Sequence, residues 1–295
     1  MVYYLDLLYS QLFVTIPEQT ASFAGQTIIV TGSNTGLGLE AARLLVRLNA
    51  SKVILAVRTL SKGEAAAADI VKSCNVPSSR VEVWQIDVSN KDSIVSFAKR
   101  AETLDRLDAA ILNAGIATFQ RKEVDGTEMH LAVNVIGAML LQLLLLPILK
   151  QSASRTGSRG RMTLVGSDMM YSINPANLQN PDGAIFPRIN RGALREGDYY
   201  AYSKLLVFYA TRRVAALNPV SEKSNVIISV QTPGACKSDI LRDEVNGFSK
   251  LMMSIGIALL ARSTETGAQT LVHAVNPELS ADAHGKFLMD CQVQK

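Results

Sequence analysis

Short apolar runs alternate with helix-like segments along the chain from residue 26 to the carboxyl end. The runs are rich in Val, Ile and Leu, which is typical of strands buried on both faces of a parallel sheet. The segments between them repeat apolar residues at helical spacing. We expect a doubly wound α/β fold, with helices on both faces of a seven-stranded parallel sheet. The expected strands are 27–30, 52–57, 81–86, 107–112, 162–165, 226–230 and 286–289, and the expected helices are 39–46, 62–74, 90–103, 129–149, 199–217, 240–262 and 264–275.

The length of 295 residues fits one large α/β domain better than two. We therefore assign residues 23–295 to one domain and residues 1–22 to an apolar extension. Residues 174–198 form an insert rich in Pro and Gly, and residues 240–262 form a helix rich in Leu and Met. We expect the insert and this helical lid to form the substrate side. The alternatives are a tolerated surface loop and a core helix.

The helix expected at 129–149 is apolar nearly all round. We predict that one face packs on the sheet and the other on a second subunit. The alternative is a membrane span. Asn134, Gly137, Gln142 and Pro147 inside the segment, and the strands that flank it, count against a span.

The first 16 residues are apolar and aromatic but are interrupted by Asp6 and Gln11 and stopped by Pro17. They lack a basic region and a cleavage site, and they are shorter than the roughly 20 residues that span a bilayer. We favour a helix folded back onto the body or a dimer partner. The alternative is an interfacial membrane anchor, against which the absence of Lys and Arg counts.

Composition narrows the partners and the compartment. The net charge of +4 comes without a long basic run, which weakly favours an anionic ligand and gives no support to nucleic acid. Three widely separated cysteines indicate a reducing compartment, so we expect a cytoplasmic protein. His130, His273 and His284 have no metal-like grouping, so we expect no metal and a structural or exposed place for each.

The turn from Thr31 to Gly38 follows the first strand and leads into the first helix of the expected sheet. Gly32 allows a tight turn, Gly36 allows the backbone to approach a pyrophosphate, and Gly38 allows the helix to pack on the sheet. The helix start then points its free N–H groups at the phosphates. We predict a dinucleotide site, although glycine spacing alone also fits a flexible loop.

Seven motifs in order give the chain a resemblance to the classical short-chain dehydrogenases/reductases, a Rossmann-type family, over about residues 23–291. Within that family it is similar to the retinol-dehydrogenase-like branch, through Val57-Arg58, Lys62-Gly63-Glu64 and residues 200–205, and it resembles reductases of fungal natural-product pathways. The seven motifs are Thr31-Gly-x-x-x-Gly-x-Gly38, Asp87-Val88, Asn113-Ala114-Gly115, Asn134, Ser167, Tyr200-x-x-x-Lys204 and Pro233-Gly234.

The candidate catalytic residues are Asn134, Ser167, Tyr200 and Lys204. A free tyrosine has a pKa near 10, so it needs a neighbouring positive charge to stabilise its phenolate, and Lys204 lies one helical turn away. The resemblance implies that Tyr200 exchanges the proton at the substrate oxygen, while Lys204 lowers the pKa of Tyr200 and holds the ribose hydroxyls. Ser167 would hydrogen-bond the same oxygen, and Asn134 would hold a water that links Lys204 to solvent.

The end of the second strand indicates NADP(H). An acid there would bind the ribose 2′-hydroxyl of NAD, whereas Arg58 suits a 2′-phosphate. Ser33, Asn34 and Lys62 would assist Arg58. The resemblance implies further contacts from three groups of residues. They are the turn Gly32, Ser33, Asn34, Thr35, Gly36, Leu37 and Gly38; the adenine and floor residues Asp87, Val88, Asn113, Ala114 and Gly115; and the nicotinamide-side residues Tyr200, Lys204, Pro233, Gly234 and Ser238.

The first hypothesis is an NADPH-dependent reductase of a ketone or aldehyde on an apolar small molecule, in secondary metabolism. We expect a homodimer or homotetramer that forms through the helices at 129–149 and 199–217. A second hypothesis is a non-redox cyclase, isomerase or regulatory NADP-binding protein on the same fold. A third is a membrane-associated retinoid or steroid dehydrogenase, with membrane contact through residues 1–16. The separation of Ser167 from Tyr200 is longer than the family's common spacing, which leaves the substrate open.

Overall fold

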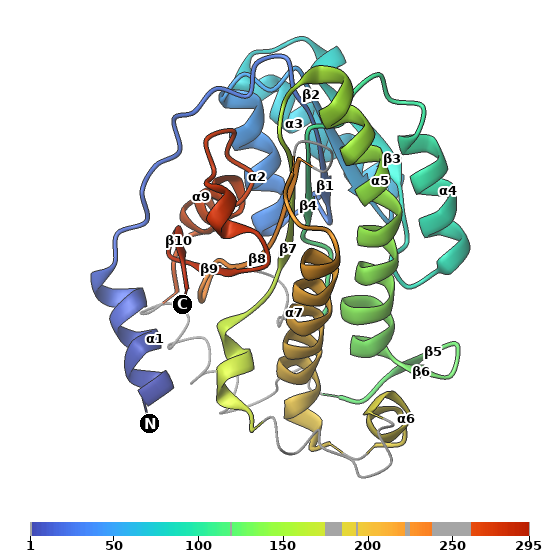
Figure 1. Cartoon of the computed structure of the whole chain (residues 1–295), viewed down its shortest axis with the longest axis vertical. Coiled ribbons are helices and arrows are strands. Elements are labelled where there is room, and N and C mark those ends of the chain that lie inside the picture. The colour runs from blue at the N-terminus through green and yellow to red at the C-terminus, as the bar shows by residue number, and fades with distance from the viewer. Residues whose placement is uncertain are drawn as a thin grey trace.

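The core of the structure is one twisted sheet with helices on both faces (Figure 1). The computed structural model describes residues 2–118, 120–174, 185–192, 194–221, 225–237 and 261–294. The strands of the sheet are β1 (Thr27–Thr31), β2 (Lys52–Val57), β3 (Val81–Gln85), β4 (Ala109–Leu112), β7 (Gly160–Val165), β8 (Val226–Thr232), β9 (Phe287–Met289) and β10 (Gln292–Val293).

The strand order is β10-β9-β8-β7-β4-β1-β2-β3, and all neighbours except β10 and β9 run parallel. The order turns at β1 and β4, where the chain changes direction across the sheet and open α/β sheets bind their ligands. This confirms the predicted Rossmann-type sheet and its seven parallel strands. The eighth strand, β10, is antiparallel and was not predicted, because two exposed residues carry no readable period.

Alternate residues of the central strands β1 and β2 enter two separate cores. Ile29 and Ile54 belong to one core, and Ile28 and Val53 belong to the other. This alternation follows from the two-residue period of a strand, and it explains why the strands read as continuous apolar runs. The first core is covered by α4 (Lys91–Ala101), α5 (Ala138–Thr156) and α7 (Tyr199–Leu217), and the second by α2 (Gly36–Arg47), α3 (Leu60–Cys74) and α9 (Thr264–His273).

The long apolar helix is a core element. It starts with a π-helical segment, η2 (Leu131–Gly137), and α5 continues to Thr156, seven residues beyond the predicted end. The helix Leu131–Thr156 is long and apolar enough to cross a membrane, but 67% of its 18-residue apolar window is buried inside the fold. Ile136 and Leu143 on this helix are exposed, as is Tyr209 on α7. The predicted sheet contact is present, and the exposed residues lie on the two helices that we expect to contact a second subunit.

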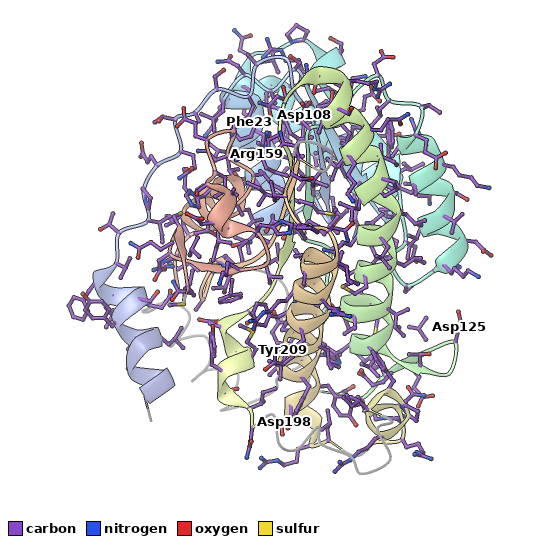
Figure 2. All side chains as sticks on the ribbon, viewed as in Figure 1. Phe23, Asp108, Asp125, Arg159, Asp198 and Tyr209 are labelled. Atoms are coloured by element: carbon purple, nitrogen blue, oxygen red, sulfur yellow. The ribbon has the colours of Figure 1, made fainter. Side chains whose placement is uncertain are left out.

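The remaining elements gather mostly at the carboxyl end of the strands, in the lower part of Figure 1. Figure 2 places Asp108 and Arg159, which precede β4 and β7, at the end of the sheet opposite to Asp198, where α7 starts. The elements at the lower end are α1 (Val2–Phe13), the hairpin β5 (Glu123–Val124) with β6 (Thr127–Glu128), η3 (Asp168–Ser172), α6 (Ile185–Asn190) and η5 (Glu196–Asp198), and two short elements lie elsewhere, η1 (Ser78–Arg80) and η7 (Ala281–Ala283).

The two segments predicted to form the substrate side are described only in part. The insert 174–198 contains α6 and η5 at its carboxyl end, while residues 175–184 and 193 lie outside the described residues. Residues 240–260 of the expected helical lid also lie outside them. Only its last two residues, Ala261 and Arg262, are described.

Gly137 marks a close approach between the helical layer and the sheet edge. A Cβ at this position would collide with the backbone carbonyl of Val88. We expect Gly137→Ala to lower the free energy of unfolding by about 3 kcal/mol, because backbone atoms on both sides must shift. Urea unfolding measures the effect. Gly197→Ala is the matched control, since a Cβ there meets nothing within 4 Å. Equal stability of the two variants would contradict this account of the packing.

Candidate active site

The turn between β1 and α2 has room for a phosphate group. Gly32 and Gly36 have φ angles of +65° and +57°, which favour glycine, and a Cβ at Gly36 would meet nothing within 4 Å. A Cβ at Gly38 would collide with the carbonyl of Gly32, so this glycine sets the close packing of helix and turn. The N-cap residue of α2, Thr35, makes no side-chain capping bond. The first N–H groups of α2 therefore remain for an anionic ligand.

The segment Asn113-Ala114-Gly115 is tied to the glycine turn. The Asn113 amide donates to the carbonyls of Thr31 and Gly32 at 2.9 and 3.2 Å. The Ala114 N–H donates to Thr31 Oγ1 at 2.9 Å. Because β4 and β1 are neighbours, these bonds join the ends of the two strands between which the strand order reverses. The structure thus brings together two motifs that are about 80 residues apart in sequence.

The end of β2 presents two exposed cations, Arg58 and Lys62. No ion pair joins either of them within the part of the chain that is described. Both therefore fit an anionic group beside the glycine turn. The Ser33 hydroxyl faces inward instead, where it is fully buried and donates to the Val30 carbonyl at 2.8 Å. Its side chain would not reach a phosphate, so only its backbone remains for the predicted role.

Two predicted adenine-side residues close the same end of the sheet. The Asp87 carboxylate accepts from both the backbone and the hydroxyl of Ser89, at 2.9 and 2.6 Å. Val88 is nearly buried and packs against Gly137. Asn34, Thr35 and Leu37 lie partly or fully exposed in the glycine turn. Their contacts with a nucleotide stay a prediction.

Tyr200 and Ser167 meet beneath the carboxyl end of β7. Ser167 follows β7 and caps η3, where its Oγ accepts from the Met169 N–H at 3.2 Å. Tyr200 lies in the first turn of α7, with its hydroxyl near the Ser167 hydroxyl. Burial raises the pKa of Tyr200 to about 12, with a smaller lowering by the Ser167 hydroxyl and a smaller raising by the Asp168 charge. Tyr200 therefore holds its proton at neutral pH.

Lys204 lies one helical turn after Tyr200, as its spacing predicts. Its ammonium is 5.5 Å from the centre of the Tyr200 ring and donates to the Val165 carbonyl at 2.7 Å. Burial lowers the pKa of Lys204 to about 8. Lys204 is not among the groups that set the pKa of Tyr200 here, so the lowering of that pKa by Lys204 stays a prediction.

Lys204→Met is expected to stabilise the ligand-free protein. Lys204 loses its proton at about pH 8 in the fold and near 10.5 in the unfolded chain, so the unfolded chain binds more protons between these values. The contribution of Lys204 to the free energy of unfolding therefore increases with pH between about 8 and 10.5, and it is least favourable below pH 8. The uncharged variant should gain about 2 kcal/mol at neutral pH, and the gain should shrink toward pH 10.5. Urea unfolding at several pH values tests this, and a less stable variant at neutral pH would contradict it.

Asn134 lies in the π-helical segment and is buried, with 3% of its surface exposed. Its side chain bonds both backbone groups of Ile116 at 2.9 Å and donates to Ser203 Oγ at 3.0 Å. A Cβ at Gly115 would lie 3.1 Å from Asn134 Oδ1 and 3.5 Å from Lys204 Nζ, so both groups reach the same glycine. The side chain thus fixes the loop after β4. The predicted water would have to be held beside these bonds.

The turn Pro233-Gly234 after β8 is covered by α1. A Cβ at Gly234 would collide with the Gln11 side chain and lie 3.0 Å from Arg262 Nη1. Arg262 also pairs with Asp290 at 2.8 Å and donates to the Ser10 carbonyl at 2.6 Å. Helix α1 therefore docks on the body beside the predicted nicotinamide end. Ser238, the last residue predicted there, lies outside the described residues.

Sequence comparison decides the family. The model of the short chain dehydrogenase family matches residues 26–174. A short chain dehydrogenase/reductase named dmxR8, from a Cryptosporiopsis species, is 40% identical over 98% of this chain and 88% of its own length. The chain belongs to the short-chain dehydrogenase/reductase family. The short-chain dehydrogenase anuD of Penicillium roqueforti is 39% identical over 99% of this chain and 76% of its own length. The resemblance to fungal short-chain reductases is thus confirmed.

Solved structures show the same short-chain dehydrogenase fold. An alcohol dehydrogenase from Thermococcus sibiricus, in complex with 5-hydroxy-NADP, has a TM-score of 0.62 at 19% identity and covers 90% of this chain and 95% of its own. A 3-ketoacyl-(acyl-carrier-protein) reductase from Brucella melitensis, in complex with NADH, has a TM-score of 0.65 at 17% identity, with 91% and 97% covered. One complex holds an NADP derivative and the other NADH, so the likeness leaves the cofactor of this chain open.

Sequence reasoning missed several polar residues around the site. Glu128 and His130 are buried next to Asn134, and Asp168 is buried next to Ser167. Burial raises the pKa of Asp168, which forms no ion pair with a described cation. A carboxylate directly after the candidate serine was a readable signal for Asp168. His130 was predicted to be structural or exposed, and it is buried, without a metal-like cluster among the described residues.

Proposed function

We propose that this short-chain dehydrogenase/reductase is an NADPH-dependent reductase of a ketone or aldehyde on an apolar small molecule. The observation that carries the proposal is the meeting of Tyr200, Ser167 and Lys204 at the carboxyl end of β7, with Tyr200 protonated. This meeting supports proton transfer to a carbonyl oxygen. A non-redox or purely regulatory protein would have no need to keep all three groups together.

The preference for NADP(H) rests on charge. Arg58 and Lys62 are exposed at the end of β2, and no acid stands there to bind a ribose 2′-hydroxyl. A 2′-phosphate beside them would gain charge-assisted hydrogen bonds. The glycine turn and the uncapped start of α2 fit the pyrophosphate. Asp87, Val88 and the segment 113–115 would border the adenosine, and Pro233-Gly234 the nicotinamide.

The residues of the chain divide the remaining work. When bound, the nicotinamide supplies a hydride to the carbonyl carbon. Tyr200 would give its proton to the carbonyl oxygen, and Ser167 would hydrogen-bond the same oxygen. Lys204 would hold the ribose hydroxyls and return a proton toward Tyr200, and Asn134 would keep the neighbouring loop in place. At neutral pH Tyr200 is protonated, which is the form that the reduction of a carbonyl requires.

The setting of the reaction is also a proposal. We place residues 23–295 in one reductase domain and the protein in the cytoplasm, where NADPH and reduced cysteines coexist. The fungal relatives and the apolar substrate side are compatible with secondary metabolism. Exposed apolar residues on α5 and α7, such as Leu143 and Tyr209, suit a homodimer or homotetramer interface.

The test is a product assay with a fixed probe panel. The full-length protein is incubated with NADPH and 1-tetralone, β-ionone or retinal, and the products are identified by mass spectrometry. We expect an alcohol from at least one probe, at a rate that depends on NADPH. Binding of NADPH without reduction of any probe would argue against the proposed activity on apolar carbonyls.

A further inference from the structure

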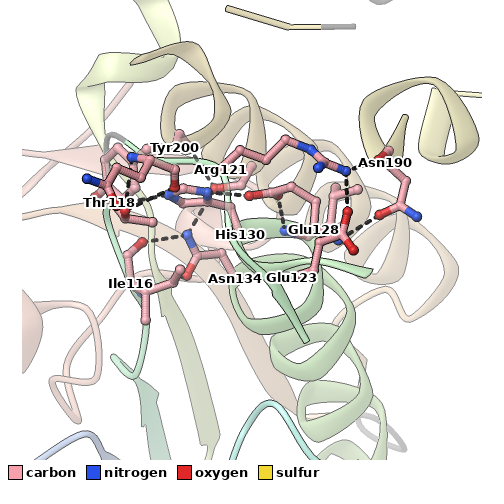
Figure 3. Close-up of polar contacts among 12 residues, drawn as sticks. Ile116, Thr118, Arg121, Glu123, Glu128, His130, Asn134, Asn190 and Tyr200 are labelled. Atoms are coloured by element: carbon pink, nitrogen blue, oxygen red, sulfur yellow. Dashed lines mark hydrogen bonds and ion pairs between the residues drawn. The ribbon is translucent and has the colours of Figure 1, made fainter. Parts of the chain in front are cut away.

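A buried acid and a buried imidazole form a pair beside the candidate active site. Glu128 ends the β5–β6 hairpin and is fully buried, and His130 opens the π-helical segment with 1% of its surface exposed. His130 Nδ1 lies 2.7 Å from Glu128 Oε1, and Glu128 Oε2 accepts from the Leu131 N–H at 3.0 Å (Figure 3). We call these two residues the Glu128–His130 pair.

The hydrogen bonds of the pair fix one tautomer of the imidazole. The Thr118 backbone N–H, which can only donate, points at His130 Nε2 at 3.1 Å. Nε2 must therefore carry a lone pair, and the ring hydrogen lies on Nδ1, where it is donated to Glu128. Burial favours a protonated carboxyl, but the bonds from His130 and from the backbone of Leu131 lower the pKa of Glu128. A carboxylate and a neutral imidazole result.

The loop after β4 is held by hydrogen bonds from Asn134 and from the Glu128–His130 pair. Asn134 holds Ile116 through two bonds of 2.9 Å, and His130 holds Thr118 two residues later. The His130 ring also presents its edge to Tyr200, with ring centres 6.4 Å apart, and stacks on Tyr199 at 6.3 Å. Figure 3 shows His130 between Thr118, Glu128 and Tyr200. A shift of His130 would therefore change the position of Thr118 and the packing against the Tyr200 ring at the same time.

The same pair is hydrogen-bonded to α6, which belongs to the described part of the insert. The Glu128 N–H donates to Asn190 Oδ1 at 2.6 Å, and the Asn190 amide donates to the Gly126 carbonyl at 2.9 Å. Arg121 donates to the Asn190 carbonyl at 2.6 Å. Asn190 is the last residue of α6, which lies between Ser167 and Tyr200 in sequence. Hydrogen bonds thus connect α6 with Glu128 and His130, and the His130 ring contacts the ring of Tyr200.

We propose that Glu128 and His130 are positioning residues of the carbonyl reduction, which hold the loop 116–118 and the ring of Tyr200 in the geometry for proton transfer. This proposal rests on the proposed function. His130 is too deeply buried to touch a substrate, so it acts through Thr118 and Tyr200. Small displacements of a proton donor are costly, since a misplacement of roughly 1 Å can slow catalysis about 100-fold.

Three variants separate the contributions. His130→Leu removes both hydrogen bonds of the ring. His130→Gln keeps one donor and one acceptor on a planar group, so it is the conservative control. Glu128→Gln leaves one oxygen where the carboxylate uses two, and its amide must face either His130 Nδ1 or the Leu131 N–H, both of which are donors.

The expected kinetic result is a loss in kcat with little change in KM. For His130→Leu and Glu128→Gln, kcat should fall roughly 10- to 100-fold, while KM and the Kd for NADPH change less than about threefold. The solvent isotope effect on kcat should increase in both, because transfer of the Tyr200 proton becomes slower relative to other steps. His130→Gln should restore kcat and the isotope effect to nearly wild-type values.

A second readout does not depend on activity. Amide hydrogen exchange at Thr118 should become roughly tenfold faster or more in His130→Leu and stay near the wild-type rate in His130→Gln. If His130→Leu does not fold, the kinetics and the amide exchange at Thr118 are measured in Glu128→Gln, with His130→Gln as the control.

The outcomes distinguish this proposal from the proposed function. Wild-type kcat in His130→Leu or Glu128→Gln, or a loss in His130→Gln equal to that in His130→Leu, would overturn the positioning role. So would a fall in kcat with an unchanged isotope effect, which indicates structural damage alone. If the wild-type protein reduces none of the probes, the proposed function fails. In that case, an unchanged rate of amide exchange at Thr118 in His130→Leu would also overturn the proposal that His130 holds the loop 116–118. A faster rate would support that proposal.

Discussion

Tyr200→Phe is expected to reduce kcat for carbonyl reduction roughly 1,000-fold, within the range that general acid catalysis contributes. The variant removes the hydroxyl near Ser167 and keeps the ring that packs beside His130. Affinity for NADPH should change less than about threefold, because the lost group acts on the substrate oxygen. Steady-state kinetics and calorimetric titration with NADPH measure the two quantities.

Tyr202→Phe is the matched control for this variant. Tyr202 lies two residues further along α7 and is buried, and its hydroxyl donates to the Asn174 carbonyl at 3.5 Å. We expect kcat within about threefold of the wild-type value, since no hydrogen bond links Tyr202 to Ser167 or Lys204. An unchanged rate in Tyr200→Phe, or equal losses in both variants, would show that Tyr200 is not the proton donor.

Arg58→Asp is expected to reverse the cofactor preference. The variant removes a cation that would pair with the 2′-phosphate and adds a carboxylate that repels it, while a carboxylate suits the 2′-hydroxyl of NADH. The Kd for NADPH should increase roughly 100-fold, and the Kd for NADH should fall severalfold. Calorimetry with each dinucleotide gives both constants for the full-length protein.

Lys99→Asp controls for the change in net charge. Lys99 is exposed near the end of α4, away from the glycine turn. This variant should keep the wild-type ratio of the two Kd values to within about twofold, because exposed charges beyond the Debye length are screened. A wild-type protein that binds NADH as tightly as NADPH, or an Arg58→Asp variant with an unchanged ratio, would remove the argument for NADP(H).

Much of the fold follows from patterns that are local in sequence. Seven parallel strands were predicted because each is an apolar run bounded by helix signals, and the switch point at β1 and β4 follows from the connections. The helix Tyr199–Leu217 has the predicted bounds. The glycine turn and the Tyr200/Lys204 spacing also depend only on neighbouring residues. Such features are readable because their physical causes lie within one or two turns of chain.

The features that were not predicted depend on contacts between distant residues. Ser10 bonds Asp290 across 280 positions, and nothing in either segment indicates the other. The Glu128–His130 pair is close in sequence, but its role appears only when Thr118 and Tyr200 come near it. The π-helical segment around Asn134 was expected as ordinary helix, because an i to i+5 pattern leaves the apolar spacing almost unchanged.

Transfer of deuterium to a carbonyl probe from NADPH that carries deuterium at both C4 positions tests the central claim most directly. Full-length protein, Tyr200→Phe and Tyr202→Phe are each incubated with the labelled cofactor and the ketone or aldehyde that the probe panel identifies. We predict that the wild-type protein and Tyr202→Phe form an alcohol with one deuterium on the carbinol carbon, and that Tyr200→Phe forms almost none. An alcohol without the label, or no alcohol from any probe, would contradict the assignment of this chain as an NADPH-dependent carbonyl reductase.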